Sequence, residues 1–525
     1  MKKVLVSDTL SEHGLAVLRA ASDLQVDYRP GLSEEDLANA IEPYEALVIR
    51  SGSKVTAKVL GRARNLEVVG RAGIGVDNVD VKEASRRGVV VMNTPTGNAV
   101  TTAEHALTLL LSLARKIPQA TASIKAGKWE KSKFEGHEVT GKTLGVIGLG
   151  NIGRIVANRA LGLKMTVLGH DPVLSADRAA QLGFELVTLD ELFRRSDFIT
   201  VHTPLTEQTR GLIDARAIDR MKPGVLLVNA ARGGIIDEEA LRAALESGKV
   251  GGAALDVFVK EPPPKDQPLL QMDRVIATPH LGASTEEAQE RVAVEIAEQI
   301  VTFLTEGGIK NAVNIPSLSP SVLPYVDLGR RLGTVLAQLD RSDVSEIRVE
   351  VAGDAAEHGV TPIANEAVAG FLAHFLDIPV NLVSAPHVAG EQGIRVLEIK
   401  SPRQGGYSAL VRVEVAGTGG SRVAAGTVMA NRPRIVSLIG FEVDADPTGS
   451  VLVMRNDDVP GVIGAVGTVL GGRGINVSRA QVGTGPRKGE AMSFWNLDSP
   501  VDDATLALLR ALPHVSAVLP VSFSQ

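Results

Sequence analysis

A short apolar strand that runs into three closely spaced glycines constrains this chain more than any other feature. Residues 144–147 are apolar, and Gly148, Gly150 and Gly153 follow in the sequence GLGNIG before a helical pattern begins. Gly148 permits a tight turn, Gly150 lets the backbone approach a pyrophosphate, and Gly153 lets the helix pack close to the strand. The free N–H groups of the helix N-terminus favour that anion. The pattern predicts a dinucleotide site on a Rossmann sheet.

An acidic residue stands where such a site needs one. Asp171 follows the next predicted strand (165–168), at about the 20-residue distance that the fingerprint requires. Its carboxylate can accept hydrogen bonds from ribose hydroxyls and repels a 2′-phosphate, so we expect NAD rather than NADP. The alternative is a tight turn in a sheet without cofactor, but the strand, the helix and the acid together favour NAD.

The alternation of apolar runs and helical patterns predicts an α/β protein of several domains. In the first hundred residues, strands are expected at 4–6, 46–49, 66–69 and 89–92. A second series of six strands begins at Leu144, and a helix over 285–305 follows it. The predicted units are a flavodoxin-like substrate domain at 1–97, completed by 286–315; a Rossmann domain at 98–285; an α+β domain at 318–446; and a βαββαβ unit at 450–525.

Composition excludes several classes of protein. The net charge of −6 over 525 residues argues against non-specific nucleic-acid binding. No apolar stretch is long enough for a membrane span, and the N-terminus lacks the pattern of a signal peptide, so a cytoplasmic location is expected. The chain has no cysteine, which removes disulfide and thiol chemistry. We expect no metal ion.

Polar side chains follow several strands of the Rossmann series, where a reaction site is expected. Arg232 offers a planar fork for a substrate carboxylate, and a histidine suits removal of a hydroxyl proton near neutral pH. Both His280 and His202 stand at strand ends, and the residues alone favour neither. Glu261, in a nearby loop, is a carboxylate that can orient an imidazole.

Several segments resemble those of one known family. GLGNIGR, NAARGGIIDEEAL, ALDVFVKEP and TPHLGAST are similar to the signature blocks of the D-isomer-specific 2-hydroxyacid dehydrogenases. RAGIGVDNVD and the length resemble the long-form members, which oxidise D-3-phosphoglycerate to 3-phosphohydroxypyruvate with NAD at the start of serine synthesis. One alternative is an enzyme for another 2-hydroxy acid, such as glycerate or lactate. The other is a nucleotide-sensing binding protein on the same fold.

The resemblance assigns roles to individual residues. It favours His280 as the acid/base, with Glu261 as its partner and Arg232 on the substrate carboxylate and carbonyl. The residues that it implies for NAD are Ile74, Gly148, Gly150, Asn151, Ile152, Gly153, Asp171, Thr203, Ala230, Arg232, Asp256, His280, Gly282 and Ala283.

The substrate phosphate and carboxylate need groups from the first domain. Backbone N–H groups around Gly73–Gly75 suit a carboxylate, because successive amides can form an anion nest. The phosphate would meet cations and donors after the second predicted strand or in the segment GKWEKSKFEG. The candidates are Arg50, Ser51, Gly52, Gly73, Gly75 and Lys131.

The last unit resembles the ACT domain, a small ligand-sensing module. The resemblance makes Asn456, Asp458 and Asn476 candidates for holding L-serine as an effector, and we expect Asp458 and Asn476 near one end of the sheet. A purely dimerising unit is the alternative. The region 318–446 resembles the intervening domain of the long-form enzymes, and the whole chain is expected to form a homotetramer.

Overall fold

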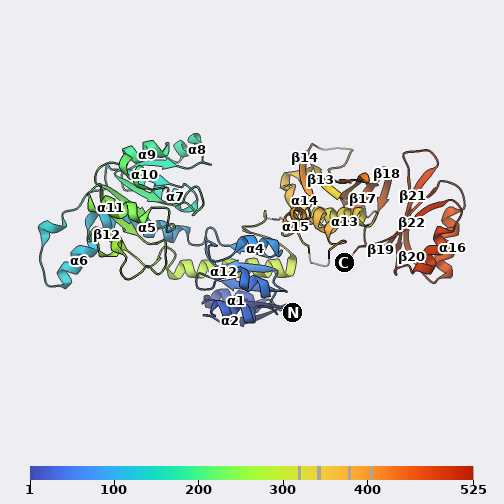
Figure 1. Cartoon of the computed structure of the whole chain (residues 1–525), viewed down its shortest axis with the longest axis horizontal. Helices are drawn as coiled ribbons and strands as arrows, with labels where there is room; N and C mark the ends of the chain where they lie inside the picture. Colours follow the sequence, from blue (N-terminus) through green and yellow to red (C-terminus); the bar gives the residue numbers. More distant parts are fainter. Residues whose placement is uncertain (317, 319–320, 340–343, 377–379, 403–405, 524–525) are drawn as a thin grey trace.

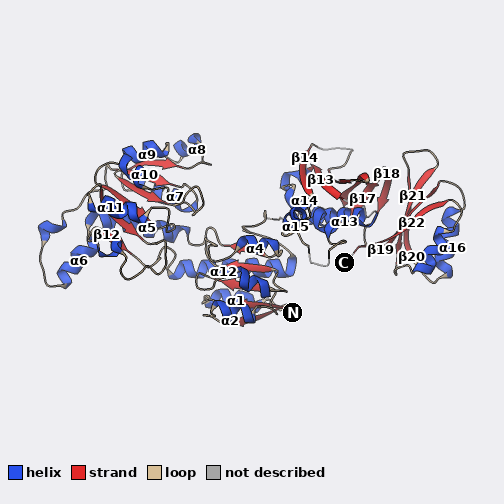
Figure 2. Ribbon diagram, in the orientation of Figure 1, coloured by secondary structure: helices blue, strands red, loops and turns tan. Residues whose placement is uncertain are grey.

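The computed structural model describes residues 1–316, 318, 321–339, 344–376, 380–402 and 406–523. The molecule is extended, with a lobe of α/β structure at one end and the C-terminal strands at the other (Figure 1). Figure 2 shows three sheets, with helices covering both faces of the first two. Among the described residues, no helix is both long and apolar enough to cross a membrane.

The first sheet has five parallel strands in the order β2-β1-β3-β4-β5. This is the flavodoxin-like order, which confirms the predicted fold class. Strand β2 is not among the predicted strands, and β4 begins two residues later than predicted. The elements are β1 Lys2–Val6, α1 Glu12–Ala20, β2 Leu24–Tyr28, α2 Glu34–Ala40, β3 Ala46–Ile49, α3 Ala57–Arg62, β4 Val68–Arg71, α4 Val81–Arg86 and β5 Val90–Asn93.

A helix from much later in the chain completes this unit. Helix α12 (Glu286–Glu306) begins after the N-cap Thr285, whose side chain accepts from the Ala288 N–H. Its Val292, Ile296 and Ile300 are buried in one cluster with the strands β1, β3 and β4. Each such side chain stabilises the packing by about 1.5–3 kcal/mol. The chain therefore leaves the first unit, forms the second and returns.

The second sheet has seven parallel strands in the order β12-β11-β10-β9-β6-β7-β8, as in a Rossmann domain. All six predicted strands are present, and the two-residue β8 is additional. Strand order reverses beside β6, the strand of the glycine motif, and ligands bind in the crevice at such a point. The strands are β6 Thr143–Ile147, β7 Thr166–His170, β8 Glu185–Leu186, β9 Phe198–Val201, β10 Val225–Asn229, β11 Val250–Leu255 and β12 Val275–Ala277. The helices are α5 Ala99–Arg115, α6 Ile117–Lys125, η1 Lys131–Phe134, α7 Asn151–Gly162, α8 Ala176–Gln181, α9 Leu189–Arg195, α10 Ala215–Arg220, α11 Glu238–Glu246 and η2 Pro268–Gln271.

The third sheet has ten strands in the order β14-β13-β15-β16-β17-β18-β20-β21-β19-β22. A single residue pair, Glu442 with Thr484, joins its two parts. The part before the junction comprises α13 Leu323–Leu339, β13 Val344–Gly353, η3 Asp354–His358, α14 Thr361–Leu372, α15 Ala385–Glu391, β14 Arg395–Ser401, β15 Ala409–Gly417, β16 Gly420–Met429, β17 Arg432–Leu438 and β18 Phe441–Ala445. The part after it comprises β19 Gly449–Asp457, α16 Val462–Gly472, β20 Val477–Thr484, β21 Glu490–Leu497, α17 Asp503–Arg510 and β22 Val515–Phe523, a βαββαβ order.

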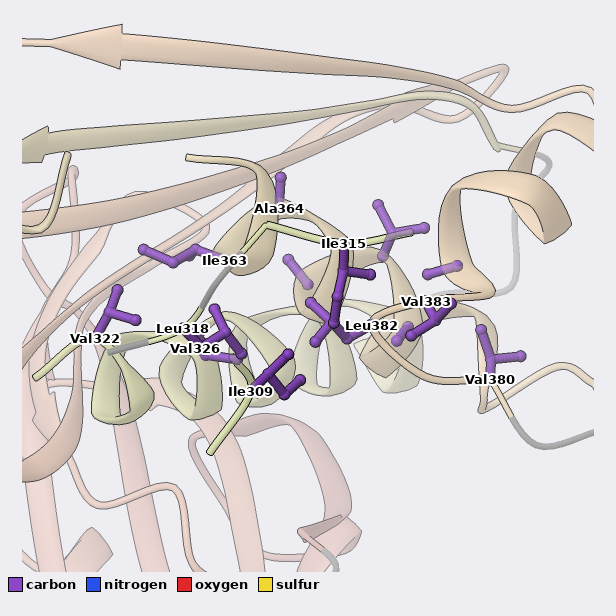
Figure 3. Packing of buried hydrophobic residues seen from close by; sticks show 14 of the residues in the cluster. Ile309, Ile315, Leu318, Val322, Val326, Ile363, Ala364, Val380, Leu382 and Val383 are labelled. Carbon is purple, nitrogen blue, oxygen red and sulfur yellow. The ribbon is translucent and has the colours of Figure 1, made fainter. Parts of the chain in front are cut away.

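A buried apolar interface, called the seam below, joins the first unit to the helices that pack on the third sheet. Ile309, Ile315 and Leu318, on the chain after α12, pack among apolar side chains of α13, α14 and the segment 380–383 (Figure 3). A polar contact adds to this seam, because the Asn381 Nδ2 donates to the Gly88 carbonyl at 2.8 Å. The two units are therefore in direct contact through both apolar and polar groups.

Candidate active site

The glycine motif has the geometry that a pyrophosphate site requires. A Cβ at position 153 would lie 1.9 Å from the Gly148 carbonyl oxygen, so only glycine allows this approach of α7 to β6. Gly148 has a φ of +89°, which glycine adopts without strain. A Cβ at Gly150 would meet nothing within 4 Å, and this space lies at the N-terminus of the 12-residue helix α7. The loop therefore leaves room for an anion where N–H groups are free.

Asp171 closes this loop from β7. Its carboxylate accepts from the backbone N–H groups of Leu149 (2.7 Å), Val173 (2.9 Å) and Leu174 (3.1 Å). Burial raises the pKa of Asp171, but these three bonds outweigh it and the net pKa is lowered. Since a carboxylate offers about four acceptor sites, roughly one remains for a ribose hydroxyl. The acid is thus ionised and holds the loop, with about one acceptor site left open.

A cavity of about 450 Å³ extends from this loop toward the first unit, and most residues expected around NAD line it. The Oγ1 of Thr203 is buried there without a hydrogen-bond partner among the described residues, so it is available to a ligand. The expected residues that line this cavity are Ile74, Gly75, Asn151, Ile152, Thr203, Ala230, Arg232, His280, Gly282 and Ala283. Asp256 lines a second cavity next to it.

His280 and Glu261 lie together in this second cavity, of about 660 Å³. The His280 Nδ1 is 2.8 Å from the Glu261 Oε2, and both side chains are partly exposed to the cavity. Burial raises the pKa of Glu261, but hydrogen bonds from His280 and the Phe258 amide lower it overall. An ionised carboxylate therefore faces Nδ1 and orients the imidazole ring, while Nε2 is left for a substrate.

His202, the other candidate base, has a different environment. Its Nε2 lies 3.0 Å from the Thr200 Oγ1, and burial lowers its pKa to about 4. It lines the 450 Å³ cavity beside Thr203 and has no carboxylate partner among the contacts of the described residues. This geometry favours His280.

Three arginines converge on the two cavities. Arg50 and Arg71 line the larger one, Arg71 and Arg232 the smaller one. Burial, and then the nearby charge of Arg232, lower the pKa of Arg71 to about 10, and its Nε has no hydrogen-bond partner among the described residues. Arg232 donates from Nε to the Asp77 Oδ2 at 2.7 Å. This excess of positive charge suits a substrate with more than one anionic group.

Arg71 is not among the predicted site residues. The predicted strand ended at Val69, which left Arg71 in a loop, whereas β4 ends at Arg71 itself. Its place at the carboxyl end of a parallel strand is the signal that a correct strand boundary would have given.

The glycines of RAGIGVDN also leave room for neighbouring side chains. A Cβ at Gly73 would lie 1.8 Å from the Arg71 Nη1, and one at Gly75 would lie 1.7 Å from the Arg232 Nη2. The missing side chains therefore make room for two guanidinium groups. The anion-binding groups that the structure brings here are side chains as well as backbone.

Two expected substrate residues lie away from the cavities. Gly52 packs against the Asp8 carboxylate, whose Oδ2 also accepts from the Arg50 N–H at 2.6 Å and so shapes the loop that carries Arg50 and Ser51. Lys131 is exposed on η1 and lines neither cavity. Within one chain, only Arg50, Ser51, Gly73 and Gly75 of the expected substrate set join the site.

The effector candidates are also separated, which corrects the expectation that two of them share one end of the sheet. Asp458 follows Asp457, which pairs with Glu490 at the start of β21, whereas Asn476 precedes Val477, which pairs with Leu497 at its end. At about 3.3 Å per residue, the two ends are roughly 20 Å apart. Asn456 is buried beside the Ser493 hydroxyl, and Asn476 donates to Asp498 at 2.8 Å. No single copy of the module brings Asp458 and Asn476 together.

Comparison with family models divides the chain into three matches. Residues 107–282 match the NAD-binding domain of D-isomer-specific 2-hydroxyacid dehydrogenases. Residues 321–439 match the D-3-phosphoglycerate dehydrogenase intervening domain, and residues 450–514 match the ACT domain. The combination agrees with the expected order of units.

Curated relatives decide the family. The D-3-phosphoglycerate dehydrogenase of Synechocystis sp. is 43% identical over 513 residues, which cover 97% of this chain and 92% of the relative. That of Archaeoglobus fulgidus is 44% identical over 485 residues, 92% of each chain. The chain belongs to the D-3-phosphoglycerate dehydrogenase family. The predicted family is thereby confirmed.

Solved structures agree with this family at the level of the first two units. The D-lactate dehydrogenase of Aquifex aeolicus, crystallised with NAD and lactic acid, has a TM-score of 0.53 and 29% identity, and covers 60% of this chain and 100% of its own. The NAD-dependent formate dehydrogenase of Staphylococcus aureus, in complex with NAD, has a TM-score of 0.55 and 30% identity, and covers 61% of this chain and all of its own. The D-3-phosphoglycerate dehydrogenase family thus shares its catalytic fold with enzymes that bind NAD.

Proposed function

We propose that this chain oxidises D-3-phosphoglycerate to 3-phosphohydroxypyruvate with NAD, the first step of serine synthesis by the phosphorylated route. The observation that carries this function is the His280–Glu261 pair beside three arginines, in a chain of this family. A 2-hydroxy acid with a phosphate matches a cavity that offers both a base and several cations.

The proton step follows from the pair. His280 accepts the C2 hydroxyl proton at Nε2, and the Glu261 carboxylate stabilises the imidazolium that forms. Arg232 binds the substrate carboxylate and polarises the developing carbonyl. The glycine loop, Asn151, Asp171 and Thr203 would hold NAD, which would supply the acceptor for the hydride from C2. Closure of the first unit over the cavity excludes water from this transfer.

The arginines that we assign to substrate binding come from both units. Arg50 and Arg71 come from the first unit and line the larger cavity, where they can bind the phosphate, while Arg232 comes from the NAD-binding unit. Arg50 also donates from Nη1 to the Thr9 carbonyl at 3.1 Å, which orients its guanidinium. Charge-assisted bonds to a phosphate are stronger than neutral ones, so this placement selects a phosphorylated substrate. Glycerate and lactate lack the phosphate and would leave both guanidiniums without an anionic partner from the substrate.

A turnover assay tests this function. Purified protein with NAD is offered 3-phosphoglycerate, D-glycerate or D-lactate, and NADH is followed by absorbance. The proposal expects kcat/KM to be highest for 3-phosphoglycerate. Preference for glycerate or lactate would assign another 2-hydroxyacid dehydrogenase, and NAD binding without turnover of any of the three would indicate a nucleotide-sensing protein.

We further propose that L-serine acts as an effector at the C-terminal module. Since Asp458 and Asn476 are at opposite ends of one module, a serine site needs two modules side by side, with Asp458 from one copy and Asn476 from the other. A carboxylate accepts from the ammonium of an amino acid, and an amide serves its carboxylate. Such a site requires at least two copies of the chain. We propose a homotetramer, and we propose a cytoplasmic location separately.

A further inference from the structure

The turn that carries His280 is fastened to Asp256. The His280 N–H donates to the Asp256 carbonyl at 2.9 Å, and the N–H groups of Leu281 and Gly282 donate to its carboxylate at 2.7 and 2.8 Å. His280 has a φ of +55°, in the left-handed region. A residue with a side chain stays in that region only where its surroundings hold it there. The three bonds to Asp256 are what hold it.

A second histidine reaches the same carboxylate from helix α5. The His105 Nε2 lies 3.1 Å from the Asp256 Oδ1 and 3.3 Å from the Thr278 Oγ1. The Thr278 hydroxyl has one proton, and it donates that proton to the Asp256 Oδ1 at 2.5 Å. Because the carboxylate and the remaining lone pairs of Thr278 only accept, His105 must donate from a protonated Nε2.

The hydrogen bond from His105 stabilises the buried negative charge of Asp256, whose burial is otherwise unfavourable. The Asp256 side chain has no exposed surface, and burial raises the pKa of this carboxyl group. Hydrogen bonds from His105, Thr278 and the Leu281 amide outweigh burial and lower its pKa overall. The ionised form is the one that accepts strongly from the amides of the turn.

His105 itself lines neither cavity, so it cannot touch a bound substrate from its place on α5. We propose that His105 is a positioning residue for the oxidation: through Asp256 it fixes the turn that aims His280 at Glu261 and the substrate. This inference rests on the function proposed above.

Two substitutions of His105 distinguish the effect of its hydrogen-bond donor from the effect of its side-chain size. His105→Leu keeps a side chain of similar bulk on α5 but removes the donor, whereas His105→Gln places an amide N–H near the position of Nε2. His387→Leu is the matched control, because His387 is half exposed on α15 and contacts Glu391. Since small displacements of a catalytic group can cost up to about a hundredfold in rate, His105→Leu should lower kcat by about ten- to a hundredfold. The KM for 3-phosphoglycerate should stay within about twofold, because the arginines that bind it are unaffected.

A measurement that needs no turnover accompanies the kinetics. Hydrogen exchange should become faster at the amides of Leu281 and Gly282 in His105→Leu, while His105→Gln should restore most of both kcat and protection. The His387→Leu control should match the wild type. If wild-type protein fails to oxidise 3-phosphoglycerate, the function proposed above fails, but the exchange result still reports on the turn.

Two results would overturn the inference. One is wild-type kcat together with unchanged exchange at residues 281 and 282 in folded His105→Leu. The other is a lowered melting temperature with kcat and exchange at the turn unchanged, which would make His105 a packing residue of α5. If His105→Leu does not fold, Thr278→Val is the second test, because it removes the other side-chain donor to the Asp256 Oδ1 and should loosen the same turn. Unchanged hydrogen exchange at residues 281 and 282 in that variant would also contradict the proposal that Asp256 and its donors hold the turn, a set of contacts that we call the clamp.

Discussion

The Arg232 Nε donates to the Asp77 Oδ2 at 2.7 Å, and this contact joins the NAD-binding unit to the first unit across the cleft. Asp77 comes from the RAGIGVDN turn after β4, and Arg232 follows β10. The contact holds the guanidinium against Gly75, where the absence of a Cβ leaves it room. The two units therefore meet at the residue that we assign to the substrate carboxylate.

Removing this contact should weaken substrate binding. In Asp77→Ala, the Arg232 side chain loses an orienting partner, and partly exposed ion pairs contribute up to about 1 kcal/mol. We expect the KM for 3-phosphoglycerate to rise by about three- to fivefold in steady-state assays, with kcat within about twofold. A lower KM in this variant would instead mean that Asp77 competes with the substrate for Arg232.

Arg71 should contribute to binding of the phosphate. A hydrogen bond to a charged group contributes about 1.5–3 kcal/mol, so Arg71→Ala should raise the KM for 3-phosphoglycerate by about tenfold or more. The KM for D-glycerate should change much less. Arg64→Ala, which removes an exposed cation of the same unit, is the control and should leave both values unchanged. An equal rise for both substrates would assign Arg71 to the carboxylate or to packing.

His202 makes stability depend on pH. Its pKa is about 4 in the folded protein and about 6.5 when unfolded, so the unfolded chain binds more protons between these values. The stabilisation is present above about pH 6.5 and is lost as the pH falls toward 4, at about 1.4 kcal/mol for each pH unit between the two pKa values. We expect the urea midpoint of the NAD-binding unit to fall less between pH 7 and pH 5 in His202→Gln than in the wild type. The same fall in both proteins would show that His202 is not buried in neutral form.

Serine should act through Asp458. We expect L-serine to inhibit turnover of the wild type, and Asp458→Ala to lose that inhibition while uninhibited kcat stays within about twofold. Because binding at the module must favour one arrangement of the units, inhibition and calorimetric binding should disappear together. Absence of serine binding to the wild type at millimolar concentration would leave the module as an assembly element.

Local patterns predicted the parts of the site that one segment encodes. The spacing of Gly148, Gly150 and Gly153 and the position of Asp171 are local, and the structure places all four around one loop. The clamp on the His280 turn could not be predicted, because it joins α5, β11 and the segment after β12, which are far apart in the sequence.

The errors in the prediction came from a misplaced strand boundary and from strand pairing that the sequence does not reveal. Ending β4 early hid Arg71, since a shift of two residues moved it from a strand end into a loop. The separation of Asp458 from Asn476 depends on how β21 pairs with β19 and β20, and no local pattern contains that register.

The central claim is that His280, held by Glu261, is the acid/base of the oxidation. The most direct test is kcat of His280→Asn, measured together with NADH binding by fluorescence. A general acid/base contributes about 10²- to 10⁴-fold, so we predict a loss of kcat in this range with NADH affinity little changed. Near-wild-type turnover in this variant would contradict the account and would direct attention to His202.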